Sequence, residues 1–524
     1  MSSGLLLWLS LDSIIWLQSL NGTNTNFSSY SSQLKQQLSI SQLQLNNLAF
    51  ASDAGKLLGF LSGIAASGYI PLWVVLLFGS FLGFIGYGLQ YLFLANHLKL
   101  SYVDICVLNV IAGNSICWIN TVCYAVVIRN FPSDLQVAVG ITTSYQGLSA
   151  KIYTDIVHAV FSSEPHETAK AYLLLNSISP VIVSFIAALQ LEKIDVGSPR
   201  SKKFGFILLF VIASVTGIYS VMSSFGLISS KISPLGGAIF NAVLLLVPLI
   251  VPIIERKLII GDVGKTDQGT GPRSSVCDSA SLDEESGCSV DRTENGLKEG
   301  AFWLFFSGVK LLLQMLDFWL FFFVYLFGAT VGMVFLNNLG QIAESRGYSG
   351  TTHDFVSLCS SFLFFGRLIP SLMDYCFSRS KNIMIHSGPA SLVLYMPLIS
   401  GAFFFLLLDK KMALYISSGI IGASTGAITS VAVTITKELF GTKGFATNYN
   451  LLIANIPLGS FAFGYGAASL YRKEGKGACM GMECYRTSFI IWGSLCTVGT
   501  FLALILFART REFYSKKLQN LNSQ

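Results

Sequence analysis

Charged residues are scarce in this chain of 524 residues: they make up 12% of it, whereas hydrophobic residues make up 52%. About a quarter of the residues in soluble domains are charged, so the composition excludes a soluble globular protein. The net charge of +6 is small and spread over loops, which argues against a nucleic-acid partner. The sequence also lacks a phosphate-binding loop, a zinc-like cysteine spacing, and a nucleophile accompanied by a base and an orienting acid. We therefore predict neither an enzyme nor a resident metal or cofactor.

Apolar segments of about twenty residues recur along the chain, and this is the length that a helix needs to cross a membrane. They predict an all-α, polytopic membrane protein embedded in a lipid bilayer. Six segments lie near residues 5–30, 44–67, 71–95, 102–128, 135–161 and 171–192, two near 204–226 and 235–254, and six near 302–337, 351–377, 385–408, 412–437, 446–471 and 486–508. This gives about fourteen spans in a 6+2+6 order.

Polar stretches divide the chain into five parts. We predict an N-terminal six-helix half (1–192), two linker helices (193–254), a cytosolic loop (255–300), a C-terminal six-helix half (301–508) and a cytosolic tail (509–524). The loop is rich in Ser, Gly, Asp and Glu, so we expect it to be disordered and available to protein partners. Lys and Arg are more frequent on the side that holds both termini, which predicts that both termini are cytosolic.

The two six-helix halves share two sequence motifs at similar separations. "GKLLGFLSG" from Gly55 matches "GRLIPSLMD" from Gly366, and "GITTSYQGLSAKI" from Gly140 matches "GFATNYNLLIANI" from Gly444. Each match joins same-numbered spans of the two halves, so the halves are predicted to be parallel repeats. Such repeats are the architecture of major facilitator transporters, in which a small solute binds near the midplane between the halves.

Several longer stretches carry a family resemblance. They are "NNLAFASDAGKLLGFLSG", "PLWVVLLFGSFLGFIGYGLQYL", "GNSICWINTVCYAVVIRNFP", "SYQGLSAKIYT", "NNLGQIAES" and "CMGMECYRTSFIIWG". Together they resemble the plant nodulin-like branch of the major facilitator superfamily, whose members include proteins similar to the nuclear-fusion-defective type. The resemblance implies a multi-pass membrane protein and membrane transport. The branch itself looks similar to oxalate/formate and monocarboxylate exchangers, which hints at the substrate.

The superfamily has a cytoplasmic gate signature after the second span of each half. It is absent from "SGIAASGYIPLW" in the first half, whereas "GRLIPSLMDYCFSRSK" in the second half preserves Gly366, Arg367, Asp374 and Arg379. In this second stretch, Pro370 occupies the usual glycine position. The resemblance implies that the four residues belong to a gate that holds one conformation by ion pairing. The alternative is a solvated turn with ordinary positive-inside charges.

The fifth span contains ionisable residues that share one helix face. The residues at helical spacing on this face are Gly140, Ser144, Gly147, Lys151, Asp155 and His158. An intramembrane charge costs roughly 2.5–3.5 kcal/mol on insertion scales, so it normally faces a cavity or a partner. We predict that Lys151 faces the central cavity and binds an anionic solute, with Asp155 as a counter-ion that solute or a proton displaces. The alternative is a permanent Lys–Asp pair that only fixes helix packing.

The second span carries a further charged pair, Asp53 and Lys56, which are three residues apart and therefore neighbours on a helix. Asp53 could bind and release a proton when it loses its partner, or the pair could simply brace the helix. Lys56 occupies the repeat position of Arg367, and these two cations with Lys151 would favour an anion inside the bundle. Three other polar residues are predicted to line the path, with interhelical hydrogen bonding as the alternative: Asn114, Tyr145 and Asn455.

The short loop "CMGMECYR" contains Cys479 and Cys484, which could form a disulfide if the loop faces an oxidising compartment. The sequence as a whole predicts a secondary transporter that moves a small, anionic organic solute by alternating access, coupled to protons or to a counter-solute. Two alternatives stay open. One is a transporter of a neutral solute, amino acid or metal chelate, and the other is a transport-dead receptor or scaffold that signals through its long loop.

Overall fold

The computed structural model describes residues 3–161, 164–191, 203–224, 233–255, 309–348, 352–377, 387–442, 444–474 and 479–522, which are nearly all helical. The predicted loop, from residue 256 on, and Arg379 lie outside these described residues. The N-terminal half contains α1 (Ser3–Leu20), α2 (Phe27–Leu38), α3 (Gln42–Ala54), α4 (Phe60–Ile64), α5 (Leu72–Leu94), α6 (Tyr102–Asn130), α7 (Leu135–Gly147), α8 (Ser149–Val160) and α9 (Pro165–Ala188).

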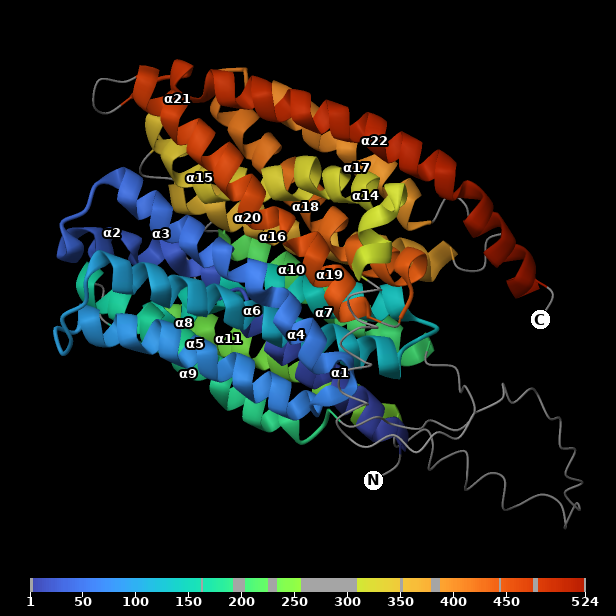
Figure 1. Cartoon of the computed structure of the whole chain (residues 1–524). Coiled ribbons are helices and arrows are strands. Elements are labelled where there is room, and N and C mark those ends of the chain that lie inside the picture. The colour runs from blue at the N-terminus through green and yellow to red at the C-terminus, as the bar shows by residue number, and fades with distance from the viewer. Residues whose placement is uncertain are drawn as a thin grey trace, which may run out of the picture.

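Two linker helices, α10 (Lys203–Ser224) and α11 (Pro234–Leu246), precede the C-terminal half. That half contains α14 (Leu316–Tyr325), α15 (Val331–Ser345), α16 (Thr352–Phe377), α17 (Gly388–Phe405), α18 (Lys411–Phe440), α19 (Phe445–Ile453), α20 (Asn455–Gly459), α21 (Gly466–Glu474) and α22 (Glu483–Asn522). Short 3-10 or π segments include η1 (Thr23–Asn26), η2 (Gly55–Gly59), η5 (Leu326–Thr330) and η8 (Ser460–Tyr465). The two halves lie side by side, and α1 begins at the end of the bundle where α22 ends (Figure 1).

Local sequence signals set several of these helix ends. Ser41 and Gln44 form a capping box at the start of α3, and Ser101 and Asp104 form one at the start of α6. In each box, the serine hydroxyl accepts a backbone N–H of the first turn, and the residue three positions on accepts the serine N–H. Proline occupies the first turn of α9, α11 and α17, where its missing N–H has no intrahelical partner to lose.

Twelve helices of the described chain are long and apolar enough to cross a membrane, and both linker helices are among them. The predicted spans at 5–30 and 135–161 are not in this set because each is interrupted. Asn21 and Gly22 separate α1 from η1, and Leu148 separates α7 from α8. The nearly all-helical membrane fold is therefore confirmed, while the 6+2+6 order stays a prediction.

The two halves pack their helices in the same pattern, as parallel repeats require. α5 packs against α6 and α9, and α17 packs against α18 and α22. A methyl group added at Gly55 would overlap the Val110 carbonyl oxygen of α6, and one added at Gly366 would overlap the Ala423 carbonyl oxygen of α18. The glycines that the repeat motifs align therefore let the second helical segment of each half approach the fourth at backbone contact.

The last helix is longer than the sequence predicted. α22 continues through the predicted tail and ends at Asn522, so the predicted boundary at residue 508 is not a helix end. The added part contains no glycine or proline, and Glu512 and Lys516 form an ion pair of 2.8 Å one turn apart. Pairs of opposite charge one turn apart stabilise an exposed helix weakly, which favours continuation of α22.

The two linker helices form a hairpin that contacts both halves, and we call α10 and α11 the linker hairpin. α10 packs against α16, where the Ser220 and Ser361 hydroxyls are 3.0 Å apart, whereas α11 packs against α8. The Tyr219 hydroxyl of α10 donates to the Gly237 carbonyl oxygen of α11 at 3.4 Å. Movement of one half against the other must therefore displace the hairpin from at least one of them.

Candidate functional site

α7 and α16 form the most extensive contact between the halves in the described chain. A methyl group added at Gly140 would overlap the Ser371 hydroxyl, and one added at Gly147 would lie 2.9 Å from the Phe364 backbone nitrogen. Tyr145 lies between the two glycines in the sequence, and its buried ring meets the Phe364 ring edge to face, with centroids 5.7 Å apart. The small residues of the predicted helix face thus permit a close approach of α7 to the other half.

Arg367 of α16 lies at this contact and is buried, with 7% of its surface exposed. Its guanidinium donates to the Thr143 carbonyl oxygen at 2.8 Å and to Gln146 Oε1 at 2.7 Å, both on α7. Its Nε–H has no hydrogen-bond partner, and none of the ion pairs in the described chain includes Arg367. Neutral groups alone therefore solvate this buried charge.

Three buried tyrosines from both halves lie in the neighbourhood of this arginine. Tyr124 of α6, Tyr325 of α14 and Tyr449 of α19 each interact electrostatically with Arg367. The Tyr124 and Tyr449 rings meet edge to face, with centroids 5.0 Å apart. A guanidinium can bind a carboxylate through two parallel hydrogen bonds, and a phenol can donate a further one. We call these four residues the arginine–tyrosine cluster, and its composition suits a small anion.

The predicted pair of the second span is present and also reaches the C-terminal half. Lys56 Nζ lies 2.6 Å from Asp53 Oδ1, and the two side chains are 8% and 9% exposed. The other oxygen of Asp53 accepts a hydrogen bond of 2.6 Å from the Ser460 hydroxyl of η8. Asn114 of α6 lies beside Gly55, and its side-chain oxygen is buried without a partner. That oxygen is a free acceptor near the pair.

Two asparagines of the repeat motif in α19 and α20 make different contacts. Asn450 Nδ2 donates to the hydroxyls of Thr121 at 3.0 Å and Ser62 at 3.3 Å, so it joins the halves. Asn455 is fully buried and accepts a hydrogen bond of 2.6 Å from the Thr330 hydroxyl in its own half. The contacts of Asn455 are those of the interhelical alternative, and its predicted place on the solute path stays a prediction.

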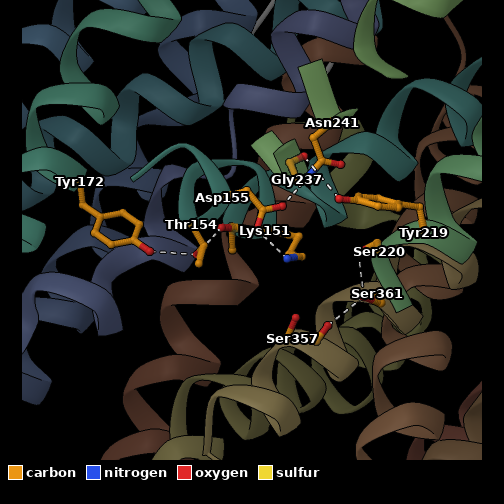
Figure 2. A network of polar contacts seen from close by, with 11 residues as sticks. Lys151, Thr154, Asp155, Tyr172, Tyr219, Ser220, Gly237, Asn241, Ser357 and Ser361 are labelled. Atoms are coloured by element: carbon orange, nitrogen blue, oxygen red, sulfur yellow. Dashed lines mark hydrogen bonds and ion pairs between the residues drawn. The ribbon is translucent and has the colours of Figure 1, made fainter. Parts of the chain in front are cut away.

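Lys151 and Asp155 form the predicted pair, with Nζ and Oδ1 2.6 Å apart on α8. Asn241 of the linker hairpin donates to the other oxygen of Asp155, and Ser357 and Ser361 of α16 lie across from Lys151 (Figure 2). The pair is therefore placed between α8 and the linker hairpin, and no described contact joins Lys151 to Arg367.

The interruption at Leu148 lies between the two parts of the predicted helix face. Gly140 and Gly147 precede it and face α16, whereas Asp155 follows it and bonds to α11. A continuous helix would have kept all these residues on one face, as the sequence analysis assumed. The single predicted face is thus divided between two neighbours, and a role of Lys151 in solute binding stays a prediction.

Only part of the predicted gate can be placed. Gly366 packs on α18 and Arg367 bonds to α7, while Asp374 lies near the end of α16. Arg379 lies outside the described residues, so the implied ion pairing is untested.

A further set of hydrogen bonds joins the halves near the end of the bundle where α22 ends. Gln136 of α7 takes part in two of them. Its carbonyl oxygen accepts a hydrogen bond of 2.6 Å from the Ser371 hydroxyl, and its side-chain oxygen accepts one from the Thr434 hydroxyl. Lys437 donates to the Pro132 carbonyl oxygen at 3.3 Å. This role of Gln136 could not be predicted from the sequence, because a single polar residue near a helix start carries no signal without its partners.

Two further predicted features lie away from these contacts. Cys479, which precedes α22, and Cys484, in the first turn of α22, form a disulfide with sulfurs 2.06 Å apart. His158 lines a cavity of about 370 Å³ between α2, α8 and α9, together with Gln33 and Thr168. Among the described residues, no group of three or more His, Cys, Asp or Glu side chains could hold a metal ion.

Comparison with known families identifies the chain. Residues 7–253 match the family described as "Nodulin-like", and residues 303–516 match "NFD4, C-terminal domain". The chain is 36% identical to Protein NUCLEAR FUSION DEFECTIVE 4 of Arabidopsis thaliana, over 98% of this chain and 90% of that protein. It belongs to the nodulin-like family.

This nodulin-like chain has the major facilitator fold. It is similar to the solved structure of the proton:xylose symporter XylE, with a TM-score of 0.60 and 10% identity over 96% of this chain and 95% of that one. It is also 24% identical to Probable transporter MCH1 of Gibberella zeae, over 47% of this chain and 48% of that protein. The family and the fold confirm three predictions: an integral multi-pass membrane protein, the major facilitator architecture, and a non-enzyme.

Proposed function

We propose that this nodulin-like protein is a secondary transporter that moves a small organic anion, of the carboxylate class, by alternating access of its two halves. The observation that carries the proposal is Arg367, a buried cation between the halves that no carboxylate of the described chain neutralises. A buried charge without an ionic partner costs several kcal/mol, on the order of 3–5 kcal/mol where a pair has been broken. A carboxylate solute would supply the missing partner.

The position of the arginine–tyrosine cluster suits such a transport cycle. Tyr124 belongs to the N-terminal half and Tyr325 to the C-terminal half, so a solute held between them would contact both halves. Rocking would separate α7 from α16 and remove the two α7 acceptors of Arg367. The arginine would then bind solute more strongly in one conformation than in another, as a ligand-driven transition requires.

We also propose that transport is coupled to protons or to a counter-solute, and that both termini of the chain are cytosolic. α1 begins and α22 ends at one end of the bundle (Figure 1), and the excess of Lys and Arg on that side favours the cytosol. The Cys479–Cys484 disulfide lies at the start of α22, which is the opposite end of that long helix. An oxidising compartment on that side would keep the disulfide formed.

The test is uptake by purified protein in proteoliposomes, with labelled acetate, lactate, oxalate and succinate, and with glucose and glutamine as neutral solutes. We expect saturable uptake of at least one carboxylate, and a loss of about tenfold or more in Arg367→Gln, because a charge-assisted hydrogen bond contributes about 1.5–3 kcal/mol. Arg129→Gln is the matched control, because Arg129 is exposed at the end of α6.

Three outcomes would contradict the proposal. Undiminished carboxylate uptake by Arg367→Gln would remove the arginine from the site. Uptake of glucose or glutamine alone would favour a transporter of neutral solutes with structural charges. A folded wild-type protein that moves none of the six solutes would favour the receptor or scaffold alternative.

A further inference from the structure

Asp12 of α1 is a buried carboxyl group to which neither the sequence analysis nor the proposed function gives a role. It is 1% exposed, and neither of its oxygens has a hydrogen-bond partner among the residues that the structure describes. The ion pairs of the described chain do not include it. Nearby polar groups of α1 bond elsewhere: Ser10 accepts from Asn130 Nδ2 at 3.1 Å, and Ser13 donates to Gln190 Oε1 at 2.5 Å.

The other two carboxylates considered for proton coupling have different surroundings. Asp53 bonds to Lys56 at 2.6 Å and accepts a hydrogen bond from Ser460, and Asp155 bonds to Lys151 at 2.6 Å. Each of these two carboxylates thus has a cation at hydrogen-bond distance, and Asp53 has a hydroxyl donor as well. Asp12 has neither, and an isolated buried carboxylate is costly, so its carboxyl group is neutral in this conformation.

The ionisable groups on the helices around α1 leave Asp12 without an ionic partner. α1 packs against α6, α7, α8, α9 and η4 (Val247–Leu249), and its Trp8 ring meets the Phe206 ring of α10. α7, η4 and the described side chains of α10 include no charged group. On α6, Asp104 caps the helix start and Arg129 is exposed. On α8, Lys151 binds Asp155 and His158 is exposed. On α9, Lys170 binds Glu167 at 2.6 Å, and His166 lies 4.0 Å from Glu167.

We propose that Asp12 is the residue that carries the coupled proton, an inference that rests on the proposed transport function. In the conformation described here, the proton is held on the carboxyl group. When α7 and α16 move apart and water enters between the halves to reach the group, its O–H bond breaks, the proton passes to water and the carboxylate is hydrated. Helix α7 connects this step to the solute site, because it packs on α1 and also accepts the hydrogen bonds of Arg367 from α16.

The first test needs no solute. Infrared spectra of the purified protein are recorded as the pH is raised, for wild type, Asp12→Asn and the matched control Asp104→Asn. We expect a protonated-carboxyl C=O band that persists well above the ordinary aspartate titration near pH 4, that is absent in Asp12→Asn and that is retained in Asp104→Asn. Asparagine is nearly isosteric with a protonated aspartate, so the variant keeps the fold. The same persistent band in Asp12→Asn, or its absence in wild type, overturns the proposal.

The second test uses proteoliposomes and the carboxylate that wild type accumulates. In Asp12→Asn we expect at least a tenfold loss of accumulation driven by a pH gradient, with solute exchange at equal pH retained. Unchanged accumulation overturns the proposal, and so does loss of both activities by a folded variant, since that pattern indicates a structural residue. Absence of any transport by wild type would instead refute the proposed function, and the infrared result would still decide whether Asp12 holds a proton.

Discussion

Arg367 and the two lysines Lys56 and Lys151 are all cations inside the bundle, but their surroundings differ. Each lysine has an aspartate one turn away on its own helical segment, with nitrogen and oxygen 2.6 Å apart. Among the described residues, Arg367 donates hydrogen bonds only to neutral acceptors, and both acceptors belong to the other half. A charge neutralised within its own helix keeps its partner while the halves move. A charge held by the opposite half loses its partners in that movement, so it is the one suited to bind a solute anion.

The largest effect expected from this comparison concerns the buried pair of the second span. Asp53→Asn leaves Lys56 without an ionic partner, and breaking a buried pair in this way costs about 3–5 kcal/mol. The double variant Asp53→Asn/Lys56→Met removes both charges and should return to within about 1 kcal/mol of wild type. Thermal unfolding of the three proteins in one detergent measures both differences. A double variant as unstable as the single one would show that Lys56 has a role beyond the pair.

Arg367 should behave in the opposite way. Arg367→Gln removes a charge that has no ionic partner, so it should not lower the unfolding temperature in the absence of solute. Wild type should be stabilised by a carboxylate that it transports, by about 2.7 kcal/mol at a hundred times the Kd, and Arg367→Gln should lose this stabilisation. Thermal unfolding with and without the carboxylate distinguishes the two proteins. A variant that is unstable in both conditions would place Arg367 among the structural charges.

The lysines and Arg367 also differ in whether their surroundings could be predicted from the sequence. The lysine pairs follow from spacings of three and four residues, which is local information, and both were predicted and are present. The repeat glycines Gly55 and Gly366 likewise follow from a motif.

The cluster around Arg367 could not be predicted in this way. Tyr124, Tyr325 and Tyr449 come from three helices far apart in the chain, and no spacing relates them. The isolation of Asp12 is similar, since the absence of a partner is a property of the packed structure and not of a motif. Lys151 shows a third case, because its spacing predicted the pair with Asp155 but could not predict the hydrogen bond from Asn241 of the linker hairpin to that pair.

The smallest effect concerns the linker hairpin, which extends the comparison to the pair of the fifth span. Asn241→Leu removes the hydrogen bond from α11 to Asp155 but leaves the Lys151–Asp155 pair intact. Because both side chains of the pair are partly exposed, we expect a loss of only about 1 kcal/mol in stability.

The Kd of the Asn241→Leu variant for solute, measured by thermal shift, should be unchanged, since the arginine–tyrosine cluster makes no described contact with Asn241. The rate of transport should change, because α10 stays bound to α16 through Ser220 and Ser361 while α11 is released from α8. A changed Kd with an unchanged rate would instead place Lys151 and Asp155 at the solute site, and Arg367 would then share with them the role that the comparison gives to it alone.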